Sequence, residues 1–407
     1  MSDEDERAYV HADSVEGLLQ RGRGLGAVRA LQDRWGVAGF VYDGIRRDWR
    51  WDGTDDRSLY LARLVQDLGL SPAPVVDQLV ADEETCLRAC HVLELLALAG
   101  SDEAREGLRA HVREGEHWAG VLESVSASWP PGWWEDLGDV ARDRIGGETE
   151  LPRYSEPWTR FGIEVRSRPF VPRPSLAGLG TEELLALLAD HSTRDDTKFS
   201  ALRALNGREP VAELIPLVPS LGTSDGRRPL PPLRRAVERL GAAAVPAARA
   251  WAQDGHGWLA QLGSEVLAEH PGPDALPGLV EELAGQWAGR VWCGPDRTAR
   301  RLARFGADAA GAVPHLRRFW LRTPHSYERA AYLQALAAID PDGLDYAYTE
   351  SLWDCEETAR LLGIASAPAG PDVLRRIEVL RDDPMESPEV RAAARVRSEA
   401  SAGPGPL

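Results

Sequence analysis

Residues 241–270 read GAAAVPAARAWAQDGHGWLAQLGSEVLAEH, and this stretch predicts two short helices joined by a polar turn. Alanine, leucine and valine dominate both flanks, whereas Asp254 to Gly257 brings together residues that favour turns. Two helices of about a dozen residues with so short a link form a helical hairpin. The stretch therefore predicts an antiparallel helical pair.

Prolines indicate that this hairpin recurs along the C-terminal half. Pro216, Pro246, Pro277 and Pro314 each lie early in a predicted first helix, at spacings of 30, 31 and 37 residues. Proline is tolerated in a first turn because its missing N–H would have been unpaired there anyway. The recurrence predicts a repeat architecture.

The most regular segments are FGADAAGAVP (305–314) with YERAAYLQAL (327–336), and LRDDP (380–384) with VRAAA (390–394). This pattern resembles the HEAT repeat family, in the variant called PBS-lyase HEAT-like repeats. In that family an aspartate occupies the inter-helix turn and a Val-Arg pair opens the second helix, and Asp383 and Val390-Arg391 match those roles. The resemblance covers about 180 to 400, and more weakly 70 to 146. It implies an all-α fold, a right-handed α-solenoid of about eight or nine HEAT-like helical hairpins, interrupted by a proline-rich insertion.

The sequence predicts four segments. Residues 1–146 are a divergent helical-hairpin part, and 181–400 are the regular HEAT-like repeats. Residues 147–180 carry prolines at 152, 157, 169, 172 and 174, which prevent a continuous helix, so they are an insertion or linker. Their apolar content, which includes Trp158 and Phe161, favours an ordered insertion over a flexible hinge. Residues 401–407 are expected to fray.

The composition favours a cytoplasmic protein. The N-terminus is acidic where a secretory signal needs positive charge, and no uncharged run approaches the roughly 20 residues that span a bilayer. The net charge of -17 disfavours non-specific nucleic-acid binding. Cys86 and Cys90 are interpreted as core residues between leucines, because no second ligand pair for a zinc ion is found. We expect neither a metal nor a cofactor.

An arginine-rich stretch stands out against this acidic background. Residues 290–329 contain nine arginines and three acids, a local charge of +6. Arg297, Arg300, Arg301 and Arg304 follow the i, i+3, i+4, i+7 spacing of one helix face. The predicted partner-binding residues are Arg297, Arg300, Arg301, Arg304, Arg318, Trp320 and Arg322. Such a face binds acidic groups and stacks on planar ones, or is simply solvated and paired with acids of the same chain.

Two shorter motifs have structural and functional interpretations. The stretch RGRGLG (21–26) has the glycines and charge of a phosphate loop without its spacing, and is interpreted as a tight connection between two helices. The charged and indole-rich stretch 46–60 is interpreted as a salt-bridged cap of the solenoid, with a binding mouth as the alternative.

These observations favour a non-catalytic scaffold that binds another protein or peptide. The alternative is a HEAT-like DNA glycosylase acting on alkylated bases, which would recruit the arginine face with Trp320 and Asp354. A third possibility is that residues 1–146, with a net charge of -12, bind a basic partner. Deoxyhypusine hydroxylase is excluded because none of the nine histidines is followed by glutamate. A bilin lyase is implied by the repeat's name alone. Oligomeric state is not predicted.

Overall fold

The protein is all-helical throughout the residues that its computed structural model describes, which are 9–34, 36–50, 53–145, 156–163 and 176–402. These residues contain 22 α-helices and several short 3-10 helices, and no β-strand. The predicted all-α class is confirmed, and the succession of paired helices is consistent with an α-solenoid.

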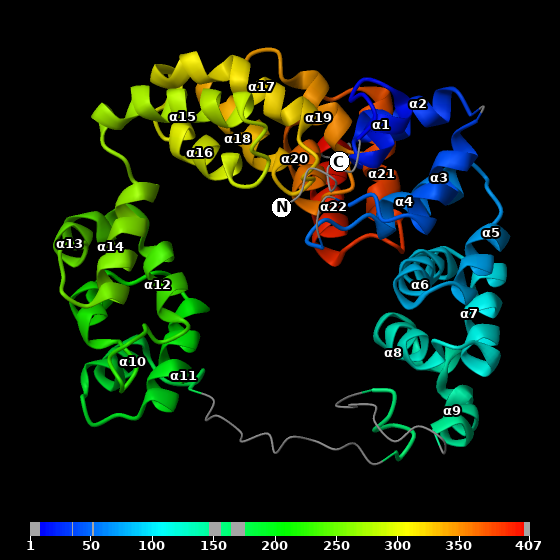
Figure 1. Ribbon diagram of the computed structural model, residues 1–407, viewed down its shortest axis with the longest axis horizontal. Helices are drawn as coiled ribbons and strands as arrows, with labels where there is room; N and C mark the ends of the chain where they lie inside the picture. The colour runs from blue at the N-terminus through cyan, green and yellow to red at the C-terminus, as the bar shows by residue number, and fades with distance from the viewer. Residues whose placement is uncertain (1–8, 35, 51–52, 146–155, 164–175, 403–407) are drawn as a thin grey trace, which may run out of the picture. The chain divides into compact units, whose positions relative to one another are not determined.

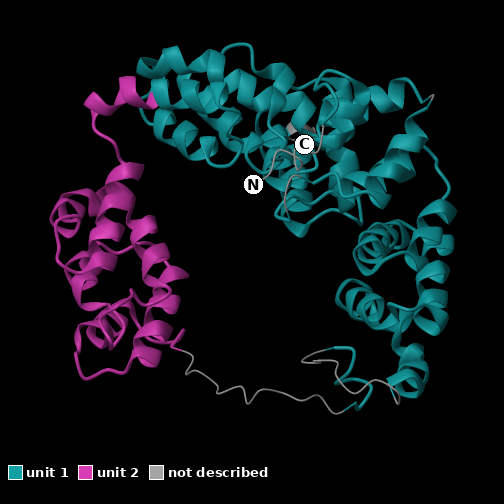
Figure 2. Cartoon of the chain, in the orientation of Figure 1, with its two compact units in different colours: residues 1–167, 280–407 teal, residues 168–279 magenta. Residues whose placement is uncertain are grey.

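The chain forms two compact units (Figure 2), Met1–Ser167 with Val280–Leu407, and Arg168–Leu279. The region 181–400 that the sequence groups as regular repeats is thus divided between both units. The second unit contains α10 (Thr181–Ala189), α11 (Asp195–Asn206), α12 (Leu233–Leu240), α13 (Val245–Trp251) and α14 (Gly257–Glu269).

The first unit contains an N-terminal and a C-terminal set of helices. The N-terminal set is α1 (Val15–Gln20), α2 (Gly24–Gln32), α3 (Val37–Arg46), α4 (Ser58–Asp67), α5 (Ala73–Val76), α6 (Glu83–Leu98), α7 (Asp102–Glu114), α8 (Trp118–Ser128) and α9 (Gly138–Ile145). The C-terminal set is α15 (Leu276–Ala288), in which the unit boundary falls, α16 (Pro295–Ala303), α17 (Val313–Arg322), α18 (Arg329–Ile339), α19 (Asp345–Ser351), α20 (Glu357–Ser366), α21 (Pro371–Asp382) and α22 (Pro388–Ala402). In Figure 1, α15, α17 and α19 run along one side of the C-terminal set and α16, α18 and α20 along the other.

Local sequence explains many of these boundaries. The hairpin predicted at 241–270 is present as a 3-10 turn at Gly241–Ala244 followed by α13 and α14. Ser101 caps α7 by accepting a hydrogen bond from the N–H of Ala104, as its sequence predicts. Pro246, Pro277 and Pro314 lie in the first turns of their helices. Pro216 differs, because a second proline at 219 restricts Ala212–Ser220 to a 3-10 helix.

The N-terminal helices pack directly on the C-terminal ones within the first unit. The buried guanidinium group of Arg23 forms two hydrogen bonds to Glu350, at 2.8 and 2.7 Å. Arg63 on α4 binds Asp383 and Glu386 in the turn before α22, at 2.6 and 2.8 Å. Cys355 and Met385 share one hydrophobic core with the helices α3 to α9. The N-terminal and C-terminal sets of helices of this unit are therefore in direct contact.

Glycines allow this close packing in the stretch 21–26. This stretch is the tight connection between α1 and α2 that the sequence predicts. Gly22 has a φ of +63°, and a Cβ atom on it would lie 2.4 Å from Sγ of Cys355. A Cβ atom on Gly24 would lie 2.0 Å from the carbonyl oxygen of Glu350. The glycines are therefore needed for the close approach of the two backbones.

The described residues of the stretch 46–60 take part in local ion pairs and in contacts with the C-terminal set. Arg46 pairs locally with Asp43 and Arg50 with Asp48, whereas Asp55 and Arg57 are buried against Ser326 of the C-terminal set. Residues 51 and 52, which belong to this predicted motif, lie outside the described residues.

Part of the predicted insertion is ordered. Trp158 is fully buried in an edge-to-face contact with Trp118, and Phe161 contacts Trp134 in the same way. The segment 156–163 therefore packs on the N-terminal helices. The remainder of the predicted insertion that precedes residue 176, and residues 403–407 of the predicted tail, lie outside the described residues. Across the described part of the chain, no helix has the length and apolar character needed to cross a bilayer.

Candidate functional site

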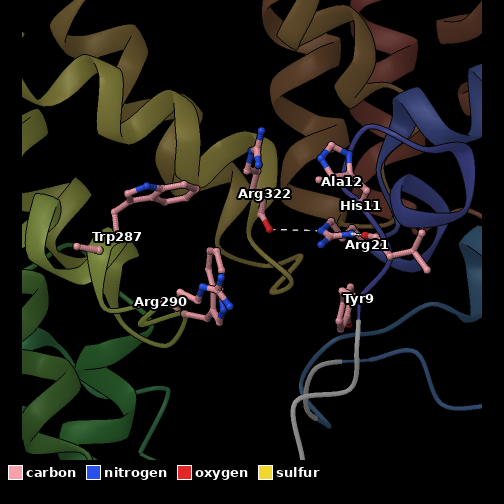
Figure 3. Close-up of a pocket in the computed structure, with 10 residues that line it drawn as sticks. Tyr9, His11, Ala12, Arg21, Trp287, Arg290 and Arg322 are labelled. Atoms are coloured by element: carbon pink, nitrogen blue, oxygen red, sulfur yellow. Dashed lines mark hydrogen bonds between the residues drawn. The ribbon is translucent and has the colours of Figure 1, made fainter.

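A cationic and aromatic pocket lies in the first unit, between the start of the chain and the C-terminal set of helices (Figure 3). Its volume is about 460 Å³, within the usual range of small-ligand sites. It is lined by Tyr9, Val10, His11, Ala12, Arg21, Trp287, Ala288, Arg290, Trp292 and Arg322. The contact of α1 and α2 with the C-terminal helices brings these two groups of residues together.

Arg21 forms the buried side of the pocket. Its guanidinium group donates to the carbonyl oxygens of Val10 and Gly17, at 3.0 and 2.8 Å, and to that of Arg322 at 3.3 Å. It also lies over the ring of Tyr9, 4.8 Å from the centroid. No carboxylate of the described residues forms an ion pair with it. Arg21 is thus a buried cation held by carbonyl dipoles.

Burial of Arg21 disfavours its charged form, and this lowers its pKa. Burial lowers the pKa of Arg21 to about 10, and the positive charges of Arg23, Arg329 and Arg322 add to this effect, whereas Tyr9 opposes it. An anion placed in the pocket would offset the same repulsion. The site therefore favours a negatively charged ligand.

Arg290 occupies a strained position at the rim. The N–H of Arg290 donates to Trp287 and that of Val291 to Gln286, the hydrogen-bond pattern that ends many helices with glycine in the left-handed region. Here an arginine has the positive φ of 52°, and among the described residues it is the one non-glycine that does. Such strain costs about 1–2 kcal/mol. A strained residue at a pocket is a reasonable indication of function.

Arg322 completes the cationic wall, and indoles provide the apolar one. The side chain of Arg322 is 47% exposed at the end of α17, and Asp13 lies 4.0 Å from it. Trp287 and Trp292 meet edge to face at 5.9 Å between ring centroids. Figure 3 shows Arg290 across the pocket from Arg21, with Arg322 between them and its carbonyl oxygen hydrogen-bonded to Arg21. Three guanidinium groups beside two indoles can bind a carboxylate or phosphate group and pack against its apolar part.

The predicted arginine face is divided between two helices. Arg297 and Arg300 are exposed on α16, Arg301 is half-buried, and Arg304 is exposed just after that helix. Arg300 forms an ion pair with Asp296 at 2.8 Å. Arg318 is exposed on α17, and of the predicted binding residues only Arg322 lines the pocket. The helices α16 and α17 lie on opposite sides of the C-terminal set (Figure 1).

The DNA glycosylase alternative would use Trp320 and Asp354, and both side chains make contacts inside the protein. Trp320 is 3% exposed, with the guanidinium group of Arg23 stacked over it at 4.5 Å. Asp354 is 4% exposed and binds Arg329 through both carboxylate oxygens. Neither side chain is placed to contact a nucleobase.

Some of the residues that line the pocket belong to motifs that are visible in the sequence, and others do not. Arg21 belongs to the glycine-rich stretch that has the charge of a phosphate loop, and Arg290 and Arg322 belong to the arginine-rich segment. Tyr9, Trp287 and Trp292 carry no local motif, because their contribution depends on contacts across the chain. Cys86 and Cys90 are buried core residues as predicted. In the part of the chain that the structure describes, no group of three or more histidine, cysteine or acidic side chains is arranged to hold a metal.

Comparison with protein-family models, curated proteins and solved structures finds no match for this chain.

Proposed function

We propose that the protein is a non-catalytic, cytoplasmic scaffold of the HEAT-like, right-handed solenoid type, and that it binds an acidic segment of another protein. The observation that carries the proposal is Arg21, a buried cation with no carboxylate partner among the described residues, facing a pocket that also presents Arg290 and Arg322. A glutamate, aspartate or phosphorylated side chain entering this pocket supplies the missing negative charge.

The pocket suits a protein segment for two reasons. Its indoles offer flat apolar surface on which the side chains next to an acidic residue can pack. Repeated helical pairs also present long surfaces along which an extended chain can continue beyond the pocket. Nucleic acid is the less suitable polyanion, because the net charge of the whole chain is -17.

The proposal is tested by fluorescence anisotropy with a labelled hexaglutamate peptide. We expect saturable binding that weakens as salt increases, because the contacts are ionic. Replacing both Arg290 and Arg322 by glutamate should weaken binding by about tenfold or more, since hydrogen bonds to charged groups contribute about 1.5–3 kcal/mol each.

A matched control separates the pocket from the rest of the arginine-rich segment. The double variant Arg297→Glu with Arg318→Glu makes the same charge change at exposed positions outside the pocket. We expect it to retain most of the binding. Equal losses in both double variants would show that binding follows general charge, and no binding by the unaltered protein would refute the proposal.

A further inference from the structure

A thiol, an imidazole and a carboxylate form a chain of contacts in the first unit. Sγ of Cys293 lies 3.0 Å from Nε2 of His325. On the other side of the imidazole ring, Nδ1 lies 3.5 Å from Oδ2 of Asp55. The three residues come from the loop between α15 and α16, the loop between α17 and α18, and the segment before α4. This order of groups is that of a nucleophile, a base and the residue that orients the base.

The thiol is accessible, whereas its partners are not. Cys293 is exposed, and the side chains of His325 and Asp55 are both 0% exposed. The other three cysteines, Cys86, Cys90 and Cys355, are buried. A reagent in solution would therefore meet one thiol, and that thiol is the one beside an imidazole.

The surroundings of Asp55 keep it ionised. Its Oδ1 accepts hydrogen bonds from the N–H and the hydroxyl of Ser326, at 2.8 and 2.6 Å. Burial would raise the pKa of Asp55, but His325, then Arg57 and Ser326, outweigh burial and hold that pKa well below its ordinary value. An ionised carboxylate facing Nδ1 favours a proton on that nitrogen, which leaves Nε2 to accept the proton of the thiol.

The remaining charged groups around the imidazole come from the neighbouring helices. Glu328, just before α18, accepts a hydrogen bond from the N–H of Gly294 at 3.1 Å and interacts electrostatically with His325. Burial raises the pKa of Glu328 to about 7, and Asp296 of α16 adds to this effect. Glu356 accepts a hydrogen bond from the hydroxyl of Ser326. The α16 helix begins two residues after Cys293, and its N-terminus favours a thiolate there.

We propose that Cys293, His325 and Asp55 form a nucleophilic site that accepts acyl groups from thioesters. The thiol of Cys293 gives its proton to Nε2 of His325, and the sulfur attacks the thioester carbonyl carbon. A new carbon–sulfur bond forms on Cys293, the donor's carbon–sulfur bond breaks, and the departing thiolate takes the proton from His325. No oxidant or reductant is required.

Thioesters fit better than amides or ordinary esters. Cleavage of those substrates depends strongly on N–H donors that stabilise the oxyanion. The N–H of Gly294, which directly follows the nucleophile, is occupied by Glu328. A thioester has a better leaving group, so its exchange with a thiol depends less on such donors. This inference does not depend on the acidic-segment pocket.

The test uses the full chain and phenyl thioacetate as the acyl donor. Intact-mass and peptide mass spectrometry should show one acetyl group, located on Cys293, with one thiophenol released. The reference is an ordinary exposed thiol, made as Ala127→Cys in a Cys293→Ser background, at an exposed position near the end of α8. We expect acylation of Cys293 to be about 100-fold faster than that of the reference.

Two variants and a pH profile separate activation of the Cys293 thiol from an effect on folding. His325→Gln and Asp55→Asn should each slow acylation to near the reference rate while circular dichroism remains unchanged. The rate of iodoacetamide alkylation against pH should have a midpoint below the ordinary thiol value of about 8.5 in the unaltered protein. If either variant fails to fold, the pH profile of the unaltered protein still tests the proposal. A midpoint at or above that of the reference thiol, or acylation no faster than the reference, would overturn the proposal.

Discussion

The guanidinium group of Arg329 binds the carboxylate of Asp354 through two hydrogen bonds, of 2.9 and 2.7 Å, while it also donates to the carbonyl oxygens of Arg21 and Gly22 at 2.8 and 3.2 Å. Arg329 is 2% exposed. Burial would lower the pKa of Arg329, but Asp354 and its other acidic neighbours outweigh burial and raise it. One buried ion pair thus connects the first helices of the chain to the C-terminal set.

Replacing Asp354 by asparagine should strongly destabilise the protein. The change removes the ion-pair partner of the buried Arg329, which costs about 3–5 kcal/mol. Urea unfolding followed by circular dichroism measures this loss. Asp372→Asn is the matched control, because its pair with Arg375 at 2.8 Å is exposed and contributes at most about 0.5 kcal/mol. Similar effects of the two substitutions would contradict the central role of the buried pair.

Gly24→Ala should destabilise the contact between α2 and α19. The added methyl group would meet the carbonyl oxygen of Glu350 at 2.0 Å, and such overpacking costs about 1–3 kcal/mol. Gly39→Ala is the control on α3, where no atom lies within 4 Å of the added carbon. It should stabilise the protein by about 0.5–1 kcal/mol through helix propensity. A tolerated alanine at position 24 would show that this contact is loose.

Arg290→Gly should increase stability and decrease binding. Glycine removes the strain of the positive φ, so the free energy of unfolding should rise by up to about 1 kcal/mol. Loss of the guanidinium group should weaken hexaglutamate binding in the anisotropy assay. Arg235→Gly, at an exposed position inside α12, should instead destabilise by about 1 kcal/mol and leave binding unchanged. If Arg290→Gly lowered stability, the strain argument would fail.

Glu328 should make stability depend on pH. Its folded-state pKa of about 7 lies above the ordinary value of 4.5, so the unfolded chain loses this proton first as the pH rises. The stability contributed by Glu328 is therefore complete below about pH 4.5 and lost by about pH 7, a change of about 3 kcal/mol.

Glu328→Gln should remove that part of the pH dependence. Urea unfolding at about pH 4.5 and about pH 8 should show the variant gaining stability relative to the unaltered protein at the higher pH. Glu378→Gln, at an exposed position on α21, serves as the control and should show no such relative gain. An identical pH dependence in the unaltered protein and Glu328→Gln would exclude Glu328 as the titrating group.

The sequence determined the helical class and many local elements, because these depend on neighbours along the chain. Alanine-rich runs, the turn at 254–257, the cap at Ser101 and the prolines in first turns specify hairpins without reference to distant residues. The same local reasoning placed Cys86 and Cys90 in the core. It also identified arginine as the distinctive residue of segment 290–329.

Which of these arginines meet depends on contacts between helices that are far apart in the sequence. The spacing of Arg297 to Arg304 predicts that they share one face of a helix. Whether each of these side chains is buried or paired depends on the residues that neighbouring helices bring close to it. Arg21 and Arg322 share a pocket, and Cys293, His325 and Asp55 share a site, because residues 21–63 pack on residues 321–386. No periodicity encodes that contact. It arises from complementary buried charges and from glycines that let two backbones approach. Both act between residues more than 250 positions apart. Arg57 and Cys355, for example, are in contact although 298 positions separate them in the chain.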